Sequence, residues 1–301
     1  MVAAAGRLEA QTDTSVPDWA VPVIDTHLHL RPTVDGNMTH MQGCGVPRAI
    51  LRVREDAGPQ VKAIQDKYPG RFAWTASVDA ARPEAAALLT TAVKNGALGF
   101  GEIKSHVEAD GPELQRLYAA AADLGVSIMV HFQEVPHFEG EGLWATGFKR
   151  FEAMLKAYPR TQFIGHADAF WANVSDGYAN DVAYPTGPIK RGGITDRLLT
   201  DYPNLFGDLS ANSGNNAMSR DPDFTRDFLQ RHQDKLLFGS DCSCSDGRGA
   251  GTSQANNPGA SRLAGKCVAR ETLTLLKRST SPEVFGKLTV GNAEKMFKLK
   301  A

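Results

Sequence analysis

The chain has 301 residues, of which 42% are hydrophobic and 22% charged, so it can bury a large core and does not have the composition of a disordered protein. Its formal net charge of −1 offers no basic surface for nucleic acid or for an anionic membrane. No apolar run approaches the roughly 18 residues that a membrane-spanning helix needs. Residues 1–20 are polar and rich in small side chains, without the apolar core of a signal peptide. We interpret them as an N-terminal extension and expect a cytoplasmic protein, while export stays open if a signal peptide was removed ahead of them.

Apolar, strand-like runs alternate with helical patterns along residues 21–301, which we interpret as one domain. The predicted strands are 22–28, 47–53, 72–78, 97–103, 126–131, 161–166, 204–210 and 236–241. Helical patterns include 83–95, 112–124, 148–157 and 224–233, and a last one over 282–299 is expected to pack outside the sheet. Strands separated by crossover helices form parallel sheets, and eight such units most simply close into a (β/α)8 TIM barrel. A doubly wound open sheet is the alternative, but no glycine-rich fingerprint follows the first strand.

The first strand ends in the sequence Asp25-Thr-His27-Leu-His29. Residues two apart in a strand project to the same face, so the two imidazoles leave the strand end side by side and can share one metal ion. Asp25 lies on the same face and could anchor or orient them. Two unrelated histidines in one strand are the alternative interpretation.

Four later strands also end in a residue that can bind a metal ion. In (β/α)8 barrels the reactive side chains come from the C-terminal ends of different strands, so a metal centre is predicted at that end. A lone histidine at a strand end is usually structural, but three strands that each end in histidine, with an aspartate after the last strand, are hard to explain in that way. The candidates beyond the first strand are Glu102, with Lys104 and His106 on the same face, and then His131, His166 and Asp241.

This ordered set resembles the amidohydrolase superfamily of metal-dependent (β/α)8 enzymes. It is most similar to the amidohydrolase 2 branch, which includes aminocarboxymuconate-semialdehyde decarboxylase and several lactonases. The resemblance runs from about Val21 to Leu299, and the closing segment 286–297 resembles the branch's C-terminal helix. The matching residues are Asp25-Thr-His-Leu-His29, Glu102, His131, His166 and Gly239-Ser-Asp241. The set is specific for the superfamily but not for a substrate.

The resemblance implies that His27, His29 and Asp241 bind the more buried metal ion. It implies that His131 and His166 bind a second metal ion or, in members with a single metal, help to hold that metal and the substrate. The expected cofactor is Zn²⁺, as one or two ions, with Mn²⁺ as an alternative.

Glu102 occupies the position at which superfamily members with two metals carry a bridging carboxylate. A carboxylated Lys104 would be the other superfamily solution, two residues further along the same face. We favour Glu102 as the bridge, because a glutamate is anionic without modification. The alternative is a structural glutamate in a salt bridge to Lys104 or Arg52.

The predicted activity is hydrolysis of a small organic ester, lactone or amide, because a bound metal activates water and polarises a carbonyl. Asp241 is the expected general base, able to protonate the leaving group later, and His166 is the second residue expected to take part in catalysis. Non-oxidative decarboxylation of a small carboxylic acid is the alternative function. It needs no acidic ligand on the fourth strand, so Glu102 favours hydrolysis.

Substrate selection is expected to come from loops at the strand ends. The loop 167–191 carries Phe170, Trp171, Tyr178 and Tyr184, which would cover an organic substrate or pack against the barrel rim. The loop 242–258 is rich in glycine, serine and asparagine and is predicted to be a mobile lid. Neutral groups of the segment 210–213 would face the same pocket. The candidates for binding a substrate carboxylate are Arg31, Arg52, Lys104 and His106.

The four cysteines do not imply disulfides in a chain of this length. We interpret them as free thiols, since no histidine–cysteine set at zinc-site spacing accompanies Cys242 and Cys244. A loop disulfide to Cys267 stays open for an exported protein.

Two other classes of protein fit the chain less well. A barrel that keeps a metal only for structure would normally close its coordination with four ligands, often cysteines, whereas here five or six candidates face an open barrel mouth. A nuclease would carry lysine and arginine clusters near the strand ends. We therefore expect a small-molecule substrate and no nucleic-acid or membrane partner, and a homodimer is left open.

Overall fold

The structure, a computed structural model, describes residues 15–252 and 261–299. Its centre is a parallel sheet whose eight strands follow one another in chain order. Hydrogen bonds from Thr26 N to Phe238 O (3.1 Å) and from Asp241 N to His27 O (2.7 Å) join the last strand region to the first. The predicted single-domain (β/α)8 barrel is therefore confirmed. The strands are β1 (Ile24–His29), β2 (Arg48–Arg54), β3 (Phe72–Ser77), β4 (Gly99–Ile103), β5 (Ser127–His131), β6 (Gln162–His166), β7 (Leu205–Asp208) and β8 (Leu236–Leu237).

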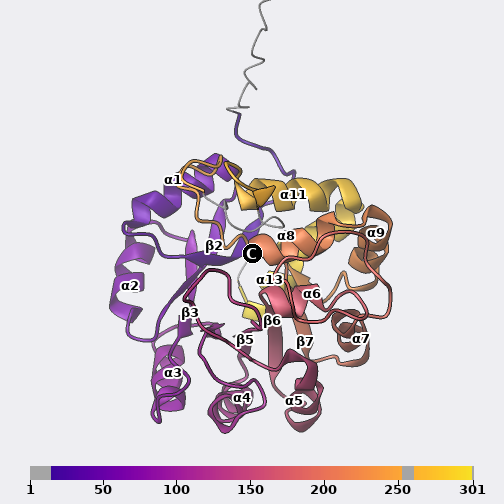
Figure 1. Cartoon of the computed structure of the whole chain (residues 1–301). Helices are drawn as coiled ribbons and strands as arrows, with labels where there is room; N and C mark the ends of the chain where they lie inside the picture. Colours follow the sequence, from indigo (N-terminus) through magenta and orange to yellow (C-terminus); the bar gives the residue numbers. More distant parts are fainter. Residues whose placement is uncertain (1–14, 253–260, 300–301) are drawn as a thin grey trace, which may run out of the picture.

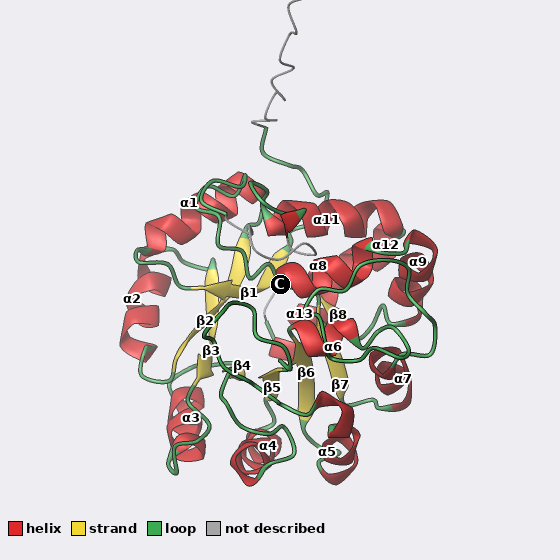
Figure 2. Cartoon of the chain, in the orientation of Figure 1, coloured by secondary structure: helices red, strands yellow, loops and turns green. Residues whose placement is uncertain are grey.

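Helices surround the strands, as Figures 1 and 2 show. The bounds of α4 match the prediction, because Pro112 fits the first turn of a helix and Gly125, with φ +63°, ends it in the left-handed conformation. The outer helices are α1 (Val34–Cys44), α2 (Gly58–Lys67), α3 (Ala85–Lys94), α4 (Pro112–Leu124), α5 (Glu152–Ala157) after the short η1 (Phe148–Arg150), α7 (Ile194–Asp201), α9 (Pro222–Arg231) and α11 (Val268–Ser279). Two further helices, α6 (Asp168–Ala172) and α8 (Ala211–Ser219), directly follow β6 and β7.

The last strand is shorter than the predicted 236–241. Only Leu236 and Leu237 pair with β7. The chain then runs close to its neighbours at Gly239, where an added Cβ would lie 2.6 Å from Asp208 Oδ1 and 2.7 Å from the Cβ of His27. A residue without a side chain is required there, and this close approach brings Asp241 next to the end of β1.

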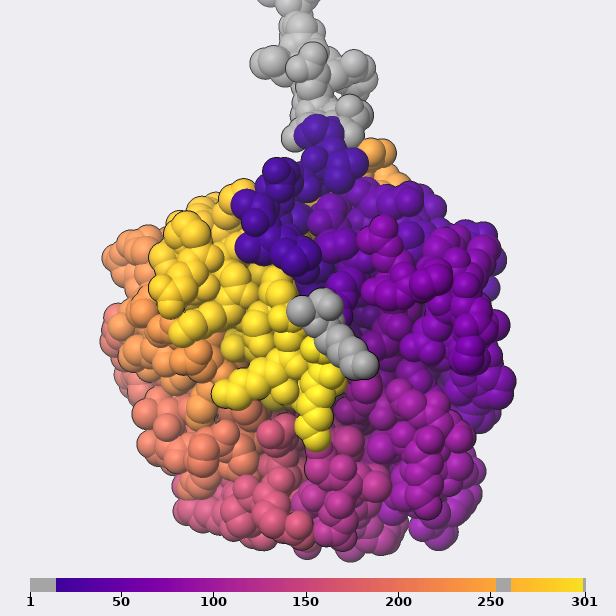
Figure 3. All heavy atoms as spheres, turned by 180° about the vertical axis from the view of Figure 1, so that it is seen from behind, coloured from indigo at the N-terminus to yellow at the C-terminus, as the bar shows by residue number. Residues whose placement is uncertain are grey.

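The C-terminal segment covers the end of the barrel at which the strands begin. It consists of α12 (Pro282–Gly286), η2 (Lys287–Gly291) and α13 (Asn292–Phe297). Ala293 and Phe297 form one buried apolar cluster with Ile24, Met129 and other strand residues. In the rear view of Figure 3 this yellow segment reaches the middle of the face. The apolar side chains at the bottom of the barrel need a cover, and this segment provides it.

The N-terminal extension joins the folded body before the predicted boundary at residue 20. The Trp19 side chain is buried, and its Nε1 donates a hydrogen bond to Cys44 O (2.9 Å) at the end of α1. Among the residues that the structure describes, no helix is long and apolar enough to cross a membrane.

A partly buried ion cluster joins α7 to α9 and gives a prediction for stability. Asp196 accepts hydrogen bonds from Arg231, and His232 Nε2 lies 2.7 Å from its Oδ1. Burial alone would raise the pKa of Asp196, but the hydrogen bonds with His232 and Arg231 outweigh burial and lower it to about 2. A depressed carboxyl pKa stabilises the fold above the unfolded value of about 4, and this contribution is lost as the pH falls towards 2.

Asp196→Asn is therefore expected to reduce the free energy of unfolding by about 2 kcal/mol at pH 7. The difference from wild type should shrink steadily below pH 4. Urea denaturation at several pH values measures it, with Asp223→Asn as the control because that side chain is 88% exposed. A difference that stays constant down to pH 2 would show that the Asp196 carboxylate is not responsible.

Candidate metal centre

The structure brings together all six residues predicted to bind metal. They come from the C-terminal ends of five strands, and all except His27 line a cavity of about 410 Å³. His27 is completely buried, whereas the His29 side chain is 54% exposed and lies at the mouth. The six are His27 and His29 from β1, Glu102 from β4, His131 from β5, His166 from β6, and Asp241 after β8.

Glu102 occupies the middle of this group and points one carboxylate oxygen at each of two pairs of imidazoles. Its Oε2 lies 3.5 Å from His27 Nε2 and 3.4 Å from His29 Nε2. Its Oε1 lies 3.4 Å from His166 Nε2 and forms a hydrogen bond with His131 Nδ1. The alternative of a salt bridge to Lys104 or Arg52 is not what the structure shows.

The spacing of these atoms fits a tetrahedral metal ion. Ligand atoms about 2.0–2.1 Å from a zinc ion at tetrahedral angles lie about 3.4 Å from one another. His27 Nε2 and His29 Nε2 are 3.4 Å apart, and Asp241 Oδ1 lies 3.3 Å from His29 Nε2. The contact between Asp241 Oδ1 and His27 Nε2 is longer, at 4.0 Å. His27, His29 and Asp241 thus offer three ligand atoms close enough together for one metal ion, and Glu102 Oε2 lies 3.5 and 3.4 Å from the two imidazole nitrogens.

Asp208, which was not predicted from the sequence, contacts two of the predicted metal ligands. Its Oδ2 lies 2.7 Å from His27 Nδ1 and 3.0 Å from His166 Nδ1, so one carboxylate oxygen serves two predicted ligands. Ser210 Oγ donates to the same oxygen. These contacts direct the opposite nitrogen, Nε2, of each ring towards Glu102. Asp208 also follows an apolar strand, Leu205-Phe-Gly, so the rule that found the other candidates applies to it.

The carboxylates make the centre favourable for positive charge. Burial alone would lower the pKa values of His29 and His166, but hydrogen bonds to Asp241, Asp208 and Glu102 outweigh it and raise both to about 10. Burial would raise the pKa values of the three carboxyls, yet the neighbouring imidazoles hold all three below their usual range. Anionic carboxylates at neutral pH suit this group to divalent cations.

Asp25 anchors the backbone rather than the imidazoles. Its Oδ1 accepts hydrogen bonds from the backbone N–H groups of His27 (3.0 Å) and Ser240 (2.8 Å). Asp25 thereby ties β1 to the segment that carries Asp241. Its part in the site is to hold the two ligand-bearing strand ends together.

Two of the four cationic candidates for substrate binding are wrong. Arg52 is 3% exposed and donates inside the barrel to Thr75 Oγ1 and Thr26 O, both at 2.6 Å. Arg31 donates to the carbonyl oxygens of Cys242 (2.9 Å) and Ser243 (3.2 Å), and so fastens the loop after β8. The terminal nitrogens of Arg52 are thus directed at backbone and hydroxyl oxygens inside the barrel, and Arg52 does not line the cavity.

The remaining two cationic candidates pack on Trp144. The Lys104 ammonium lies 5.3 Å from the centre of the Trp144 ring and lines the cavity. The His106 ring stacks on Trp144 with centroids 3.7 Å apart, and His106 is not among the residues that line the cavity. Lys104 is therefore the one predicted cation that the structure places at the cavity.

Of the four aromatic residues in the loop 167–191, Tyr184 lines the cavity and stacks on His137 with centroids 5.7 Å apart. Phe170 and Trp171 belong to α6 and are buried in the core, as the alternative interpretation of rim packing expected. Tyr178 donates to Val182 O (2.6 Å) within its own loop. The segment after β7 contributes Asn212 and Ser213 to the cavity, as predicted.

The loop 242–258 was predicted to be a lid, and its part up to residue 252 is packed against the barrel body. Cys242, Cys244 and Gly247 are buried, and Ser243 lines the cavity. Asp246 accepts hydrogen bonds from three following backbone N–H groups, which fixes the turn. Residues 253–258 of the predicted lid lie outside the described residues.

Comparison of the sequence with models of protein families and with curated proteins finds no match. Solved structures do match. Dihydroorotase from Campylobacter jejuni is 17% identical, with a TM-score of 0.55 over 93% of this chain and 84% of that one. A TatD homologue from Escherichia coli is 16% identical, with a TM-score of 0.53 over 93% and 99%. An uronate isomerase from Bacillus halodurans is 9% identical, with a TM-score of 0.52 over 90% and 70%.

The likeness shows that this chain shares the fold of these structures. One of the three is an isomerase, so the shared fold does not select a reaction. The function must be argued from the side chains of the site.

Proposed function

We propose that this chain is a metal-dependent hydrolase of the amidohydrolase superfamily that acts on a small organic ester, lactone or amide. The observation that carries the proposal is the position of Glu102, with one carboxylate oxygen towards each of two imidazole pairs. An anionic group in this position can hold two cations a few ångströms apart. The resemblance to the amidohydrolase 2 branch supports the same assignment, and its lactonases favour a lactone among the three substrates.

The ligands divide into two sets. His27, His29 and Asp241 would hold one Zn²⁺ ion, His131 and His166 would hold the other, and Glu102 would contribute to both. When bound, the ions would lower the pKa of a water molecule and polarise the carbonyl of the substrate.

Asp241 is the residue placed to move protons. Its side chain is 27% exposed and lines the cavity, and its lowered pKa keeps the carboxylate unprotonated at neutral pH. It would take a proton from the attacking water and return it to the leaving oxygen or nitrogen. His166 is 1% exposed with both ring nitrogens engaged, so we assign it to holding the metal and its neighbours in place.

The rest of the cavity suits a small polar molecule. Its volume of about 410 Å³ is typical of small-molecule sites. Lys104 provides a cation at one side, and the buried Ser213 hydroxyl has no hydrogen-bond partner among the described residues. These groups would bind a substrate carboxylate or carbonyl away from the reacting bond.

The test compares the metal content of wild type and Glu102→Gln by elemental analysis. The mutant amide cannot bridge two cations, so it should contain about one metal ion per chain fewer than wild type. Glu108→Gln is the control, because that carboxylate is 65% exposed and outside the site. Both proteins are then assayed on a panel of esters, lactones and amides and on carboxylic acids for release of carbon dioxide.

An equal metal content in wild type and Glu102→Gln would overturn the bridged centre. Release of carbon dioxide from an acid, without hydrolysis of any ester, lactone or amide, would replace the proposed reaction by decarboxylation.

A further inference from the structure

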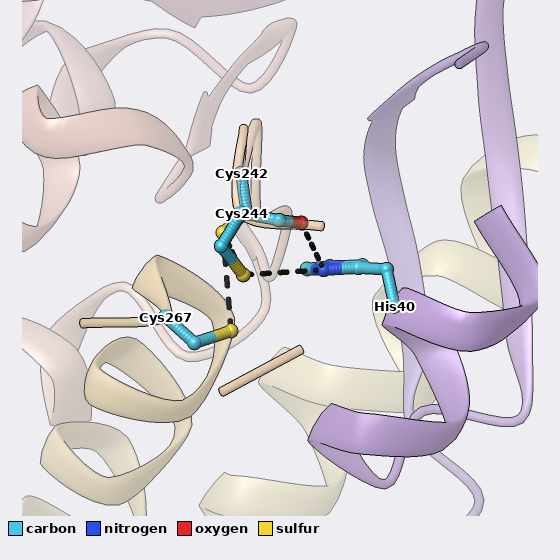
Figure 4. Close-up of side chains that lie close together, drawn as sticks. All are labelled: His40, Cys242, Cys244 and Cys267. Atoms are coloured by element: carbon cyan, nitrogen blue, oxygen red, sulfur yellow. Dashed lines mark hydrogen bonds between the residues drawn. The ribbon is translucent and has the colours of Figure 1, made fainter. Parts of the chain in front are cut away.

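Three cysteines and a histidine that do not line the cavity point towards one another in the protein interior (Figure 4). They are contributed by three separate segments: α1, the loop after β8, and the residue directly before α11. All four cysteines are free thiols, as predicted, and no disulfide to Cys267 is present. No histidine stands at zinc-site spacing from Cys242 and Cys244 in the sequence, but the fold brings His40 to Cys244 from 204 positions earlier in the chain. The cluster consists of His40, Cys242, Cys244 and Cys267.

The geometry of this cluster fits a closed tetrahedral site. Four-coordinate zinc with Zn–S bonds of about 2.3 Å separates two sulfurs by about 3.8 Å, and a sulfur from a nitrogen by about 3.6 Å. The Sγ atoms of Cys242 and Cys267 are 3.8 Å apart, and those of Cys242 and Cys244 are 3.3 Å apart. Cys244 Sγ lies 3.4 Å from His40 Nδ1.

Unlike the proposed catalytic centre, which lies at a cavity, this cluster is buried. Its four residues are between 0% and 6% exposed, so it offers no open position for a substrate. Buried thiols are weak hydrogen-bond donors and satisfy one another poorly, whereas thiolates are preferred ligands of zinc. Four protein ligands of the Cys₃His type are typical of structural zinc.

The backbone around the cluster is built for close contact between α1 and the loop. An added Cβ at Gly43 would lie 1.8 Å from Asp246 O, and one at Gly247, where φ is +68°, would lie 2.1 Å from His40 O. Glycine at both positions lets the two backbones touch, and this contact sets the His40 ring beside Cys244.

From these observations we infer that His40, Cys242, Cys244 and Cys267 bind one structural Zn²⁺ ion. Each cysteine binds as a thiolate and releases its proton to solvent, while His40 binds through Nδ1 as a neutral imidazole. Its other ring nitrogen, Nε2, faces Cys44 Sγ at 3.9 Å. The ion then fastens the loop that begins directly after Asp241 to α1 and α11.

The charge of the site is balanced nearby. Three thiolates around Zn²⁺ leave a net negative charge, which needs compensation in the interior. The Arg31 guanidinium donates to the carbonyl oxygens of Cys242 and Ser243 and so lies beside the cluster. This arginine, first considered for substrate binding, is placed to provide that compensation.

The first test uses metal content and cobalt spectra of purified full-length protein. Cys242→Ser and Cys267→Ser should each lose about one zinc ion per chain, and Cys44→Ser, the matched control, should lose none. Protein loaded with Co²⁺ should show thiolate-to-cobalt charge-transfer absorption in the near ultraviolet. That band should disappear in the two cysteine variants and persist in His27→Ala, because the catalytic centre contains no sulfur.

The second test needs no variant and covers the case in which the serine variants fail to fold. Titration of wild-type protein with an organomercurial, which captures thiolates, should release about one zinc ion to a chromogenic chelator. The inference is overturned if no zinc is released, if the cobalt protein lacks the charge-transfer band, or if the cluster holds iron. It is also overturned if alkylation without reductant shows a disulfide among these cysteines.

The two metal proposals fail separately. Glu102→Gln tests only the centre at the cavity, and the cysteine variants test only the buried cluster. If both proposals hold, wild-type protein contains about three metal ions per chain, and each set of variants removes a different one.

Discussion

Asp241→Asn is expected to lower kcat about 10²- to 10⁴-fold on whichever ester, lactone or amide the wild type hydrolyses. Asparagine keeps the size of aspartate but cannot accept the proton of the attacking water. The backbone should be undisturbed, because Asp241 has φ +44° and asparagine tolerates this left-handed conformation as well as aspartate does. The hydrogen bond from its backbone N–H to His27 O involves no side chain and remains available.

The measurement must separate the loss of a base from the loss of a metal ligand. Steady-state kinetics in excess Zn²⁺, together with the metal content of the same sample, does this. Asp223→Asn provides a matched control, since it removes one exposed carboxylate far from the site. Wild-type kcat in Asp241→Asn would show that another group accepts the proton. Recovery of the rate on adding zinc would show that Asp241 serves only as a ligand.

The residues of the centre that could be predicted are those whose position depends on the local sequence pattern. An apolar run with a polar residue at its end predicts a buried parallel strand that delivers a side chain to the barrel mouth. That rule located His29, Glu102, His131 and His166. The same rule applies to Asp208 at the end of β7, which was not among the predicted residues.

The features that the sequence did not predict depend on contacts between distant segments. Nothing near His40 in the sequence indicates that α1 lies against the loop after β8, so the Cys₃His cluster emerges only in the fold. The helical pattern over 282–299 indicates an apolar face but not which end of the barrel it covers. Arg52 lies among apolar residues in β2 and was expected near a strand end, where it could bind substrate. Its guanidinium instead donates to Thr26 O and Thr75 Oγ1 inside the barrel.

Asp208→Asn should weaken metal binding at the cavity about 10- to 100-fold, although Asp208 is not itself expected to bind metal. One oxygen of the wild-type carboxylate faces the Nδ1 atoms of His27 and His166, while the other accepts from the backbone N–H of Ser210 (3.3 Å). An amide has a single acceptor oxygen. Whichever way it turns, its NH₂ group faces either the imidazoles or the Ser210 N–H, which are donors.

Competition with a chromogenic chelator measures the change in zinc affinity, and the expected pattern distinguishes orientation from general damage. Both cations should bind more weakly, because His27 belongs to one proposed set of ligands and His166 to the other. Zinc in the Cys₃His cluster should be retained, which makes that ion an internal control for folding. Ser210→Ala removes one donor to Asp208 but leaves both acceptor oxygens, so its effect on affinity should be smaller. An unchanged affinity in Asp208→Asn would mean that Glu102 and the strand ends alone orient the two imidazoles.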